Sequence, residues 1–142
     1  MKRCNLWVLA VALVATGFSW PQASEKRSGT AIPDVVGAWS GTWGSYPAES
    51  KEKPAMPMDC AVVRKDGVWH ATFEGECGRP YKYTIKMAGR QAGDVVLFKG
   101  TTDLGEKDGG VYDWISKADG KEFVGFYTSA NYTGVFHLSR PK

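Results

Sequence analysis

The protein has 142 residues, of which 43% are hydrophobic and 23% are charged, and this length and composition suit one small domain with one core. The formal net charge of +3 falls by two, to +1, without Lys2 and Arg3. A nearly neutral chain excludes electrostatic binding to nucleic acid or to an anionic membrane surface as its function.

Residues 1–23 have the layout of a secretory signal peptide. Two basic residues precede an apolar run at 6–15, which is too short to span a bilayer, and small and helix-breaking residues follow it. We therefore expect export to the periplasm or the extracellular space, with no membrane association after cleavage. An uncleaved N-terminal anchor is the alternative. Residues 24–34 are expected to be a disordered or extended lead-in, and 35–142 the folded domain.

The domain is expected to be all-β, because apolar and polar residues alternate with period two and no convincing helical stripe is found. Turn residues separate the runs, as at Asp66-Gly67, between Gly89 and Asp94, and at Asp119-Gly120. Prolines in the segment 45–57 predict a long surface loop. The expected strands are about 36–44, 58–65, 68–75, 81–88, 94–102, 110–116, 121–129 and 132–140.

Two hairpin registers can be predicted from the turns. A two-residue turn at Asp66-Gly67 sets Val62 opposite Ala71 and Cys60 opposite Phe73, so that one face of the pair is apolar and the other mostly polar. A turn at Ala130-Asn131 likewise predicts an aromatic inner face made of Phe123, Gly125, Tyr127, Tyr132, Gly134, Phe136 and Leu138.

The outer face of this last hairpin is less polar than a solvated face should be. It carries Val124, Phe126 and Val135, which leaves room for a protein partner there.

Cys60 and Cys77 are the two cysteines of the expected mature chain. Cys77 has the parity of the apolar face and Gly75 offers a bulge, so a disulfide between them is predicted, as suits an exported protein. Two cysteines with two distant histidines, His70 and His137, do not have the spacing of a metal site, and no metal is expected.

Eight antiparallel strands joined by hairpins leave two edges exposed unless they close. Eight is also the number at which a small up-and-down barrel closes around side chains or one small ligand. We therefore expect an eight-stranded antiparallel up-and-down β-barrel.

The sequence Gly37-x-Trp39 at the start of such a barrel resembles the lipocalins, and SGTWGS at 40–45 resembles the first strand of the avidins; both are calycins. The resemblance implies that Trp39 lies at the closed end beside Arg140. No lipocalin C-terminal helix and no match for the biotin-binding polar residues of avidins is found. The segment FVGFYTSANYTGVFHLSR at 123–140 is similar to the ends of secreted bacterial proteins.

Strand polarity places the loops 45–57, 76–80, 103–110 and 129–131 at the open end. Inward aromatic residues and polar groups near that end are the candidate ligand contacts. They are Trp43, Tyr46, Arg79, Tyr83, Tyr127, Asn131 and Tyr132. A filled interior and a ligand-sized cavity are both compatible with so many aromatic residues.

No serine or cysteine has a recognisable catalytic partner, so neither enzyme activity nor a cofactor is expected. The first hypothesis is an exported, non-enzymatic barrel that binds a small hydrophobic or aromatic ligand at its open end. The alternative is a filled barrel that acts through its surface, as an envelope interaction module or as an inhibitor of a secreted enzyme. A small-barrel isomerase or cyclase is a third possibility.

Overall fold

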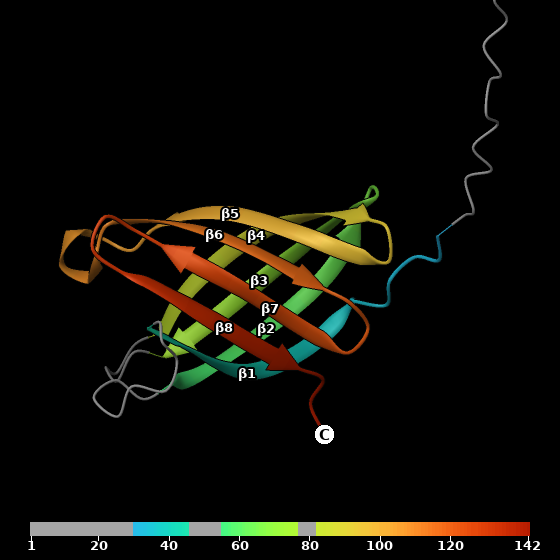
Figure 1. The fold of residues 1–142 in the computed structure, drawn as a ribbon, viewed down its shortest axis with the longest axis horizontal. Coiled ribbons are helices and arrows are strands. Elements are labelled where there is room, and N and C mark those ends of the chain that lie inside the picture. Colours follow the sequence, from blue (N-terminus) through green and yellow to red (C-terminus); the bar gives the residue numbers. More distant parts are fainter. Residues whose placement is uncertain (1–29, 46–54, 77–81) are drawn as a thin grey trace, which may run out of the picture.

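The computed structural model describes residues 30–45, 55–76 and 82–142, which form a closed antiparallel barrel (Figure 1). Each strand pairs with the next, and β8 pairs with β1. The strands are β1 (Gly37–Ser45), β2 (Met56–Lys65), β3 (Val68–Glu76), β4 (Lys82–Ala92), β5 (Val95–Asp103), β6 (Val111–Ala118), β7 (Glu122–Thr128) and β8 (Thr133–Ser139), with a short 3-10 helix, η1 (Glu106–Asp108), between β5 and β6. The predicted eight-stranded up-and-down barrel is confirmed.

Both predicted hairpin registers are confirmed. Val62 pairs with Ala71 in the β2–β3 hairpin, and Phe123 pairs with Leu138 in the β7–β8 hairpin. Asp66 and Gly67 have φ values of 52° and 76°, as the two central residues of a type I′ turn require. The turn chemistry therefore sets the register, and the register decides which side chains point inward.

Strand β4 is longer than expected because Gly89 lies inside it rather than in a turn. The strand continues to Ala92 and pairs with β5 up to Val95, and the chain turns at Gly93. A Cβ atom at position 89 would come within 2.6 Å of the Phe98 ring, so this glycine makes room for an aromatic side chain. A glycine required for packing cannot be told from a turn glycine by sequence alone.

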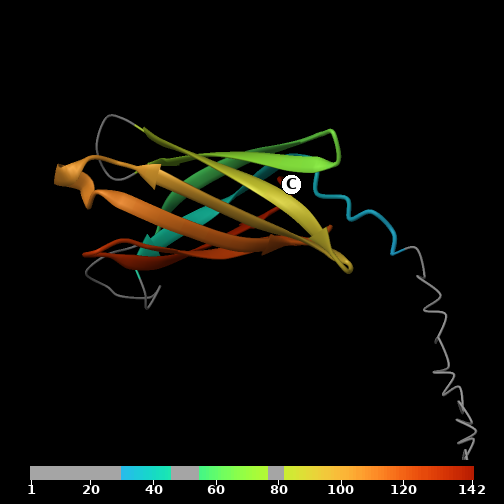
Figure 2. The same ribbon diagram turned by 90° about the horizontal axis from the view of Figure 1, so that it is seen from above.

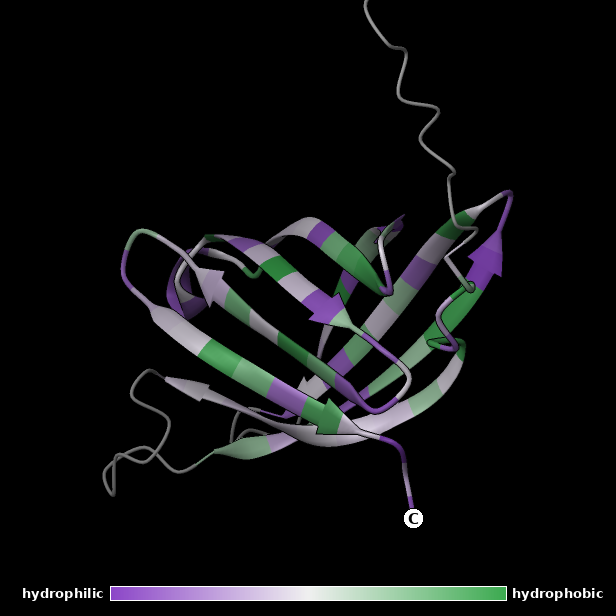
Figure 3. Ribbon diagram, turned by 45° about the vertical axis from the view of Figure 1, so that its right-hand side comes forward, coloured by the Kyte–Doolittle hydropathy of each residue, from purple (hydrophilic) through white to green (hydrophobic). Residues whose placement is uncertain are grey.

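Buried and exposed side chains alternate along the strands, which gives the ribbon in Figure 3 its banded colouring. On β6 the side chains of Tyr112, Trp114, Ser116 and Ala118 are buried, and those between them are exposed. Because side chains alternate across a strand, one face fills the barrel and the other meets solvent.

Aromatic rings centred on Phe123 fill the part of the interior next to Trp39. Its ring centroid lies 4.8 Å from that of Phe98, 5.2 Å from that of Phe73 and 5.7 Å from that of Trp39. Edge-on and tilted contacts of this kind are the favoured arrangements of aromatic pairs.

Trp39 and Arg140 plug one end of the barrel, where the resemblance to lipocalins implied that they would meet. The guanidinium carbon of Arg140 lies 4.0 Å from the centroid of the Trp39 ring, and the indole Nε1 donates a 3.0 Å hydrogen bond to the carbonyl of Val35. Arg140 also donates to the carbonyls of Asp34 and Val36, at 2.6 and 3.0 Å. These contacts tie residues 34–36 to the closed end.

The predicted disulfide is not found at Cys60, which is a buried free thiol among the described residues. Its predicted partner, Cys77, lies outside the described residues. The bulge that the prediction required is not present, because Gly75 pairs in regular register with Met58 on one side and Tyr83 on the other. Glu76, the last residue of β3, therefore lies about 10 Å along the strand from Phe73, the residue that pairs with Cys60.

Within the described ranges, no helix is long and apolar enough to cross a membrane. Residues 1–29 lie outside those ranges, so the signal peptide stays a prediction. The two ends of the barrel are distinguished in Figure 2, where the segment leading into β1 leaves one end and η1 lies at the other.

Candidate ligand site at the open end of the barrel

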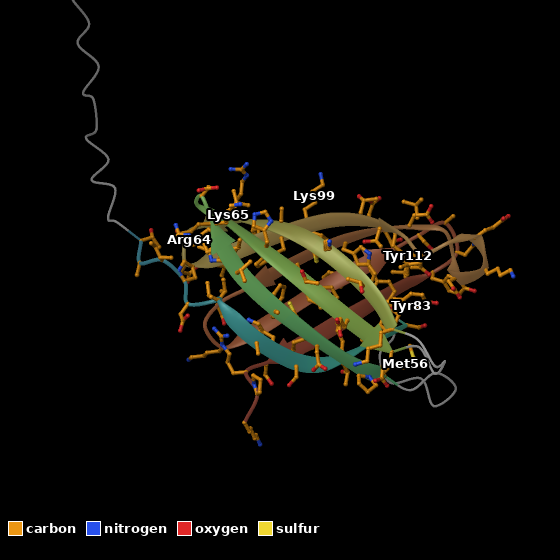
Figure 4. All side chains as sticks on the ribbon, turned by 180° about the vertical axis from the view of Figure 1, so that it is seen from behind. Met56, Arg64, Lys65, Tyr83, Lys99 and Tyr112 are labelled. Carbon is orange, nitrogen blue, oxygen red and sulfur yellow. The ribbon has the colours of Figure 1, made fainter. Side chains whose placement is uncertain are left out.

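A pocket of about 410 Å³ lies at the open end, opposite the Trp39–Arg140 plug. Its volume falls within the range of about 300–1,000 Å³ that is typical of small-molecule sites. Figure 4 shows three of its lining residues, Met56, Tyr83 and Tyr112, at one end of the barrel, with Arg64 and Lys65 at the other. The lining residues are Trp43, Ser45, Met56, Tyr83, Leu104, Lys107, Asp108, Tyr112, Tyr127 and Tyr132.

Trp43 and Tyr127 form the aromatic floor of this pocket. Their ring centroids are 5.6 Å apart, and both side chains are buried. Trp114 lies beneath them, 4.7 Å from Tyr127 and 6.4 Å from Trp43 between ring centroids. The indole Nε1 of Trp43 donates a 2.8 Å hydrogen bond to the carbonyl of Glu76, which holds this ring to the end of β3.

Glycines without side chains give the floor its shape. A Cβ atom at Gly134 would lie 2.1 Å from the ring carbon that bears the Tyr127 hydroxyl, and one at Gly75 would lie 3.1 Å from the indole nitrogen of Trp43. Gly134 pairs with Tyr127 on the neighbouring strand, and Gly75 lies across the barrel interior from β1, where Trp43 is. The two rings can therefore lie across the mouth of the barrel.

The β5–β6 and β7–β8 connections build the upper wall. Tyr112 donates a 2.9 Å hydrogen bond to the carbonyl of Asp108, and a Cβ atom at Gly109 would meet both Tyr112 and Tyr132. In the β7–β8 turn, the backbone N–H of Ser129 donates to the carbonyl of Tyr132 at 2.7 Å. These contacts place Tyr132 and η1 together at the mouth.

The polar side chains of the pocket are those of Ser45, Lys107, Asp108 and the four tyrosines. The Tyr127 hydroxyl makes no hydrogen bond to another described residue, and burial raises the pKa of Tyr127 to about 12. Burial also raises the pKa of Tyr112. Both phenols are therefore neutral at physiological pH. The Tyr112 hydroxyl donates its hydrogen to the Asp108 carbonyl, so that of Tyr127 is the one left for a ligand, and the lining includes one basic residue, Lys107, and one acidic residue, Asp108.

The structure brings four of the seven predicted contacts together: Trp43, Tyr83, Tyr127 and Tyr132 all line the pocket. Asn131 is exposed in the β7–β8 turn and is not among the lining residues. Tyr46 and Arg79 lie outside the described residues, as does most of the predicted loop 45–57. A ligand contact by Tyr46 and Arg79 stays a prediction.

Several lining residues were missed by the sequence reasoning. Tyr112 has the same inward parity as Trp114 and lies within the predicted strand 110–116, so the alternation of that strand could have identified it. Leu104, Lys107 and Asp108 come from the β5–β6 connection, where no periodic pattern indicates which side chains face the mouth.

Histidines and acidic residues are not gathered into a catalytic or metal site in the described part of the chain. His70 and His137 are exposed, and His137 lies 3.6 Å from the Glu122 carboxylate. No cluster of three or more potential metal ligands is found among the described residues. A hollow of about 570 Å³ on the outside of β1–β3 is lined mainly by small side chains, with Asp59 and Glu74 paired across β2 and β3.

No family model and no curated protein matches the sequence. Among solved structures, that of Rv2717c from M. tuberculosis is similar, with 12% identity over 76% of this chain and 93% of that chain and a TM-score of 0.48. Two single-residue variants of the fluorescent protein UnaG have 12% and 13% identity over 76% and 75% of this chain and 96% and 95% of theirs, with TM-scores of 0.43 and 0.44. At these levels of similarity, function must be inferred from this chain's own residues.

Proposed function

We propose that the protein is a non-enzymatic binding protein that holds a small, planar, aromatic or hydrophobic ligand at the open end of its barrel. The observation that supports this proposal most directly is the aromatic floor of Trp43 and Tyr127, which lies beneath a 410 Å³ pocket instead of being covered by further core residues. Met56, Leu104 and Tyr83 extend the apolar surface up the walls.

The polar groups of the pocket favour a ligand that carries a hydrogen-bond acceptor. The neutral hydroxyl of Tyr127 has no partner among the described residues. An acceptor oxygen on the ligand would satisfy the phenol, and an anionic substituent would face Lys107 at the rim.

The affinity expected for such a site is moderate. Burial of roughly 250 Å² of apolar ligand surface contributes about 6 kcal/mol at 25 cal/mol per Å², before the costs of ordering the ligand are subtracted. An acceptor bonded to a buried phenol adds about 1 kcal/mol. Dissociation constants in the micromolar range or weaker are therefore expected.

The test compares naphthalene with 2-naphthoate, which share one ring system and differ in the acceptor group. Binding is followed by quenching of tryptophan fluorescence and by calorimetry. We expect both probes to bind, with 2-naphthoate the tighter by about tenfold or less. Tyr127→Phe should reduce this preference while it retains naphthalene binding, because it removes the hydroxyl that would bond the acceptor and leaves the ring and Lys107 in place.

Thr128→Val is the matched control, because it removes a neighbouring hydroxyl that lies on the outside of β7. It should leave both affinities unchanged. Binding at this pocket would be refuted if the wild-type protein responded to neither probe. It would also be refuted if Trp43→Ala left naphthalene binding unaltered.

Action through the outer surface is the second candidate. It is supported by Ile115 and Phe126, apolar side chains that are 62% and 60% exposed on neighbouring strands. The two candidate functions use opposite faces of the same strands and are compatible with each other.

A further inference from the structure

Aromatic side chains make up most of the apolar lining of the pocket at the open end. The aliphatic residues of the described lining are Met56 and Leu104. The aromatic residues, which we call the aromatic cage, are Trp43, Tyr83, Tyr112, Tyr127 and Tyr132. An aromatic ring differs from an aliphatic side chain in the negative potential over its face, which attracts a positive charge. This composition therefore favours a ligand that carries a cation.

The rings of the cage come from several strands and are set at wide angles to one another. The Trp43 ring is at 89° to that of Tyr83 and at 58° to that of Tyr127, with centroids 6.3 and 5.6 Å apart. The Tyr112 ring is at 56° to that of Tyr127, with centroids 6.0 Å apart. Figure 4 shows Tyr83 and Tyr112 at the same end of the barrel. Rings on different walls can contact one cation from several sides, as in the aromatic cages that bind quaternary ammonium groups.

Tyr132 completes the cage at the mouth of the barrel. A Cβ atom at Gly109 would meet both the Tyr112 hydroxyl and the Tyr132 ring, so these two side chains lie close together there. Gly109 has a φ of 100°, a conformation that favours glycine. The Tyr132 side chain is 48% exposed, whereas that of Tyr112 is 5% exposed. The outer ring of the cage is therefore available to cover a ligand from the solvent side.

Asp108 adds a negative charge beside the cage. It lines the pocket and is half-buried, whereas Glu106 and Lys107 on the same 3-10 helix are exposed. The Tyr112 hydroxyl donates a 2.9 Å hydrogen bond to the Asp108 carbonyl, which ties η1 to the cage. Burial is the largest cause of the raised pKa of Tyr112, and the negative charge of Asp108 raises it further. A charge that opposes an anion at this phenol favours a cation in the same place.

We propose that the ligand carries a quaternary ammonium group, which the aromatic cage holds beside Asp108. This inference rests on the proposed function, because it names the chemistry of a ligand in the same pocket. The Tyr127 hydroxyl is left for an acceptor elsewhere on that ligand. Lys107, the basic residue of the lining, is exposed, so its flexible side chain can extend its charge into solvent and away from the cation.

The test compares phenyltrimethylammonium with tert-butylbenzene, which have the same shape and differ by one positive charge. Calorimetry at low salt measures both affinities. We expect the cation to bind about tenfold more tightly, because several partly desolvated rings and a carboxylate attract it. Tyr83→Leu should reduce this preference. Tyr83→Phe should retain it, because phenylalanine keeps the aromatic face.

Asp108→Asn tests the contribution of the carboxylate. This substitution should weaken phenyltrimethylammonium binding by about threefold or more and leave tert-butylbenzene binding unchanged, because it removes a charge and little else. Glu106→Gln is the matched control, because it removes one negative charge from an exposed residue of η1 that is not among the lining residues. Solvent screens such a charge, so both affinities should stay nearly unchanged.

Three results would each overturn the inference. In the first, tert-butylbenzene binds the wild-type protein as tightly as phenyltrimethylammonium does. In the second, Tyr83→Leu leaves the preference for the cation unchanged, and in the third, Asp108→Asn and Glu106→Gln have equal effects on binding of the cation. Naphthalene separates this failure from that of the proposed function. Naphthalene binding without a preference for the cation would overturn this inference alone, whereas no response to any of the three probes would refute both proposals.

Discussion

Arg140 shows how one side chain can close an end of the barrel. Its guanidinium lies over the Trp39 ring and donates to the carbonyls of Asp34, Val36 and Ala38. The planar fork of arginine suits this combination, because one face covers the indole while the edge supplies several donors. These three carbonyls, before and at the start of β1, therefore each accept a hydrogen bond from one side chain.

Replacement of Arg140 by Met should lower the free energy of unfolding by about 2–3 kcal/mol, the combined contribution of a cation–π contact and the charged hydrogen bonds. Urea denaturation followed by fluorescence measures this change. Lysine at the same position should not restore stability, since an ammonium group cannot cover the ring and reach several carbonyls at once.

Arg64→Met provides a matched control for that prediction. Arg64 also lies over a tryptophan, with its guanidinium carbon 4.4 Å from the Trp69 ring centroid, but it is an exposed side chain on β2. Arg64→Met should lower the free energy of unfolding by about 1 kcal/mol or less. Equal effects of the two substitutions would show that the hydrogen bonds of Arg140 contribute nothing.

At the scale of the strands, inward glycines and inward aromatics are complementary. Gly134 faces the Tyr127 ring, Gly125 faces the end of the Phe136 ring, and Gly89 faces Phe98. Glycine weakens a strand, because it adds backbone entropy to the unfolded chain and no packing surface. Here the loss is offset by large rings that could not otherwise fit inside so narrow a barrel.

Gly134→Ala should therefore be destabilising, although alanine is ordinarily the better residue in a strand. The new methyl group would force the Tyr127 ring to move, with an expected loss of about 1–3 kcal/mol in unfolding free energy. Because Tyr127 is part of the pocket floor, the naphthalene affinity should fall as well. Denaturation and calorimetry on the same samples test both effects.

Gly120→Ala is the control for this substitution. Gly120 lies in the β6–β7 connection, and a Cβ atom there would meet its nearest neighbour at an ordinary 3.9 Å. Stability and ligand affinity should be unchanged or slightly improved in this variant. A loss as large as that of Gly134→Ala would contradict the steric explanation.

At the scale of the whole molecule, closure of β8 on β1 removes every sheet edge and creates an interior from which water is largely excluded. Two acidic groups are placed in this interior. Burial raises the pKa of the Cys60 thiol from its ordinary value of 9.0 to about 12, and that of Tyr127 from 10.0 to about 12.

The fold should consequently lose stability in alkaline solution. Between about pH 9 and 12 the unfolded chain releases the Cys60 proton while the folded chain retains it, so the unfolded state binds fewer protons and the free energy of unfolding falls as the pH rises. One such group contributes a slope of up to about 1.4 kcal/mol per pH unit.

Urea denaturation at pH 8, 9, 10 and 11 measures this slope. Cys60→Ala should make it shallower, because alanine has no proton to release, whatever the variant's stability at neutral pH. Tyr127→Phe should act in the same direction above about pH 10, the ordinary pKa of a tyrosine. An unchanged slope in both variants would show that these two groups titrate alike in the folded and unfolded states.

The sequence by itself determined the strands and the two hairpin registers. These features depend on local rules, namely period-two alternation and turn chemistry such as Asp66-Gly67, which act between neighbours in the chain. The same alternation identified Phe126 and Val135 as outward and Trp43 and Tyr127 as inward, and the structure confirms both orientations.

Only the tertiary structure decided which inward residues fill the barrel and which line a pocket. Tyr112, Leu104 and Met56 come from different strands and connections, and they meet Trp43 only because the barrel closes. Closure likewise decided that Gly89 provides space for a ring and that Cys60 is a buried free thiol. Packing and solvation in the interior depend on residues brought together from across the chain, and no local pattern carries that information.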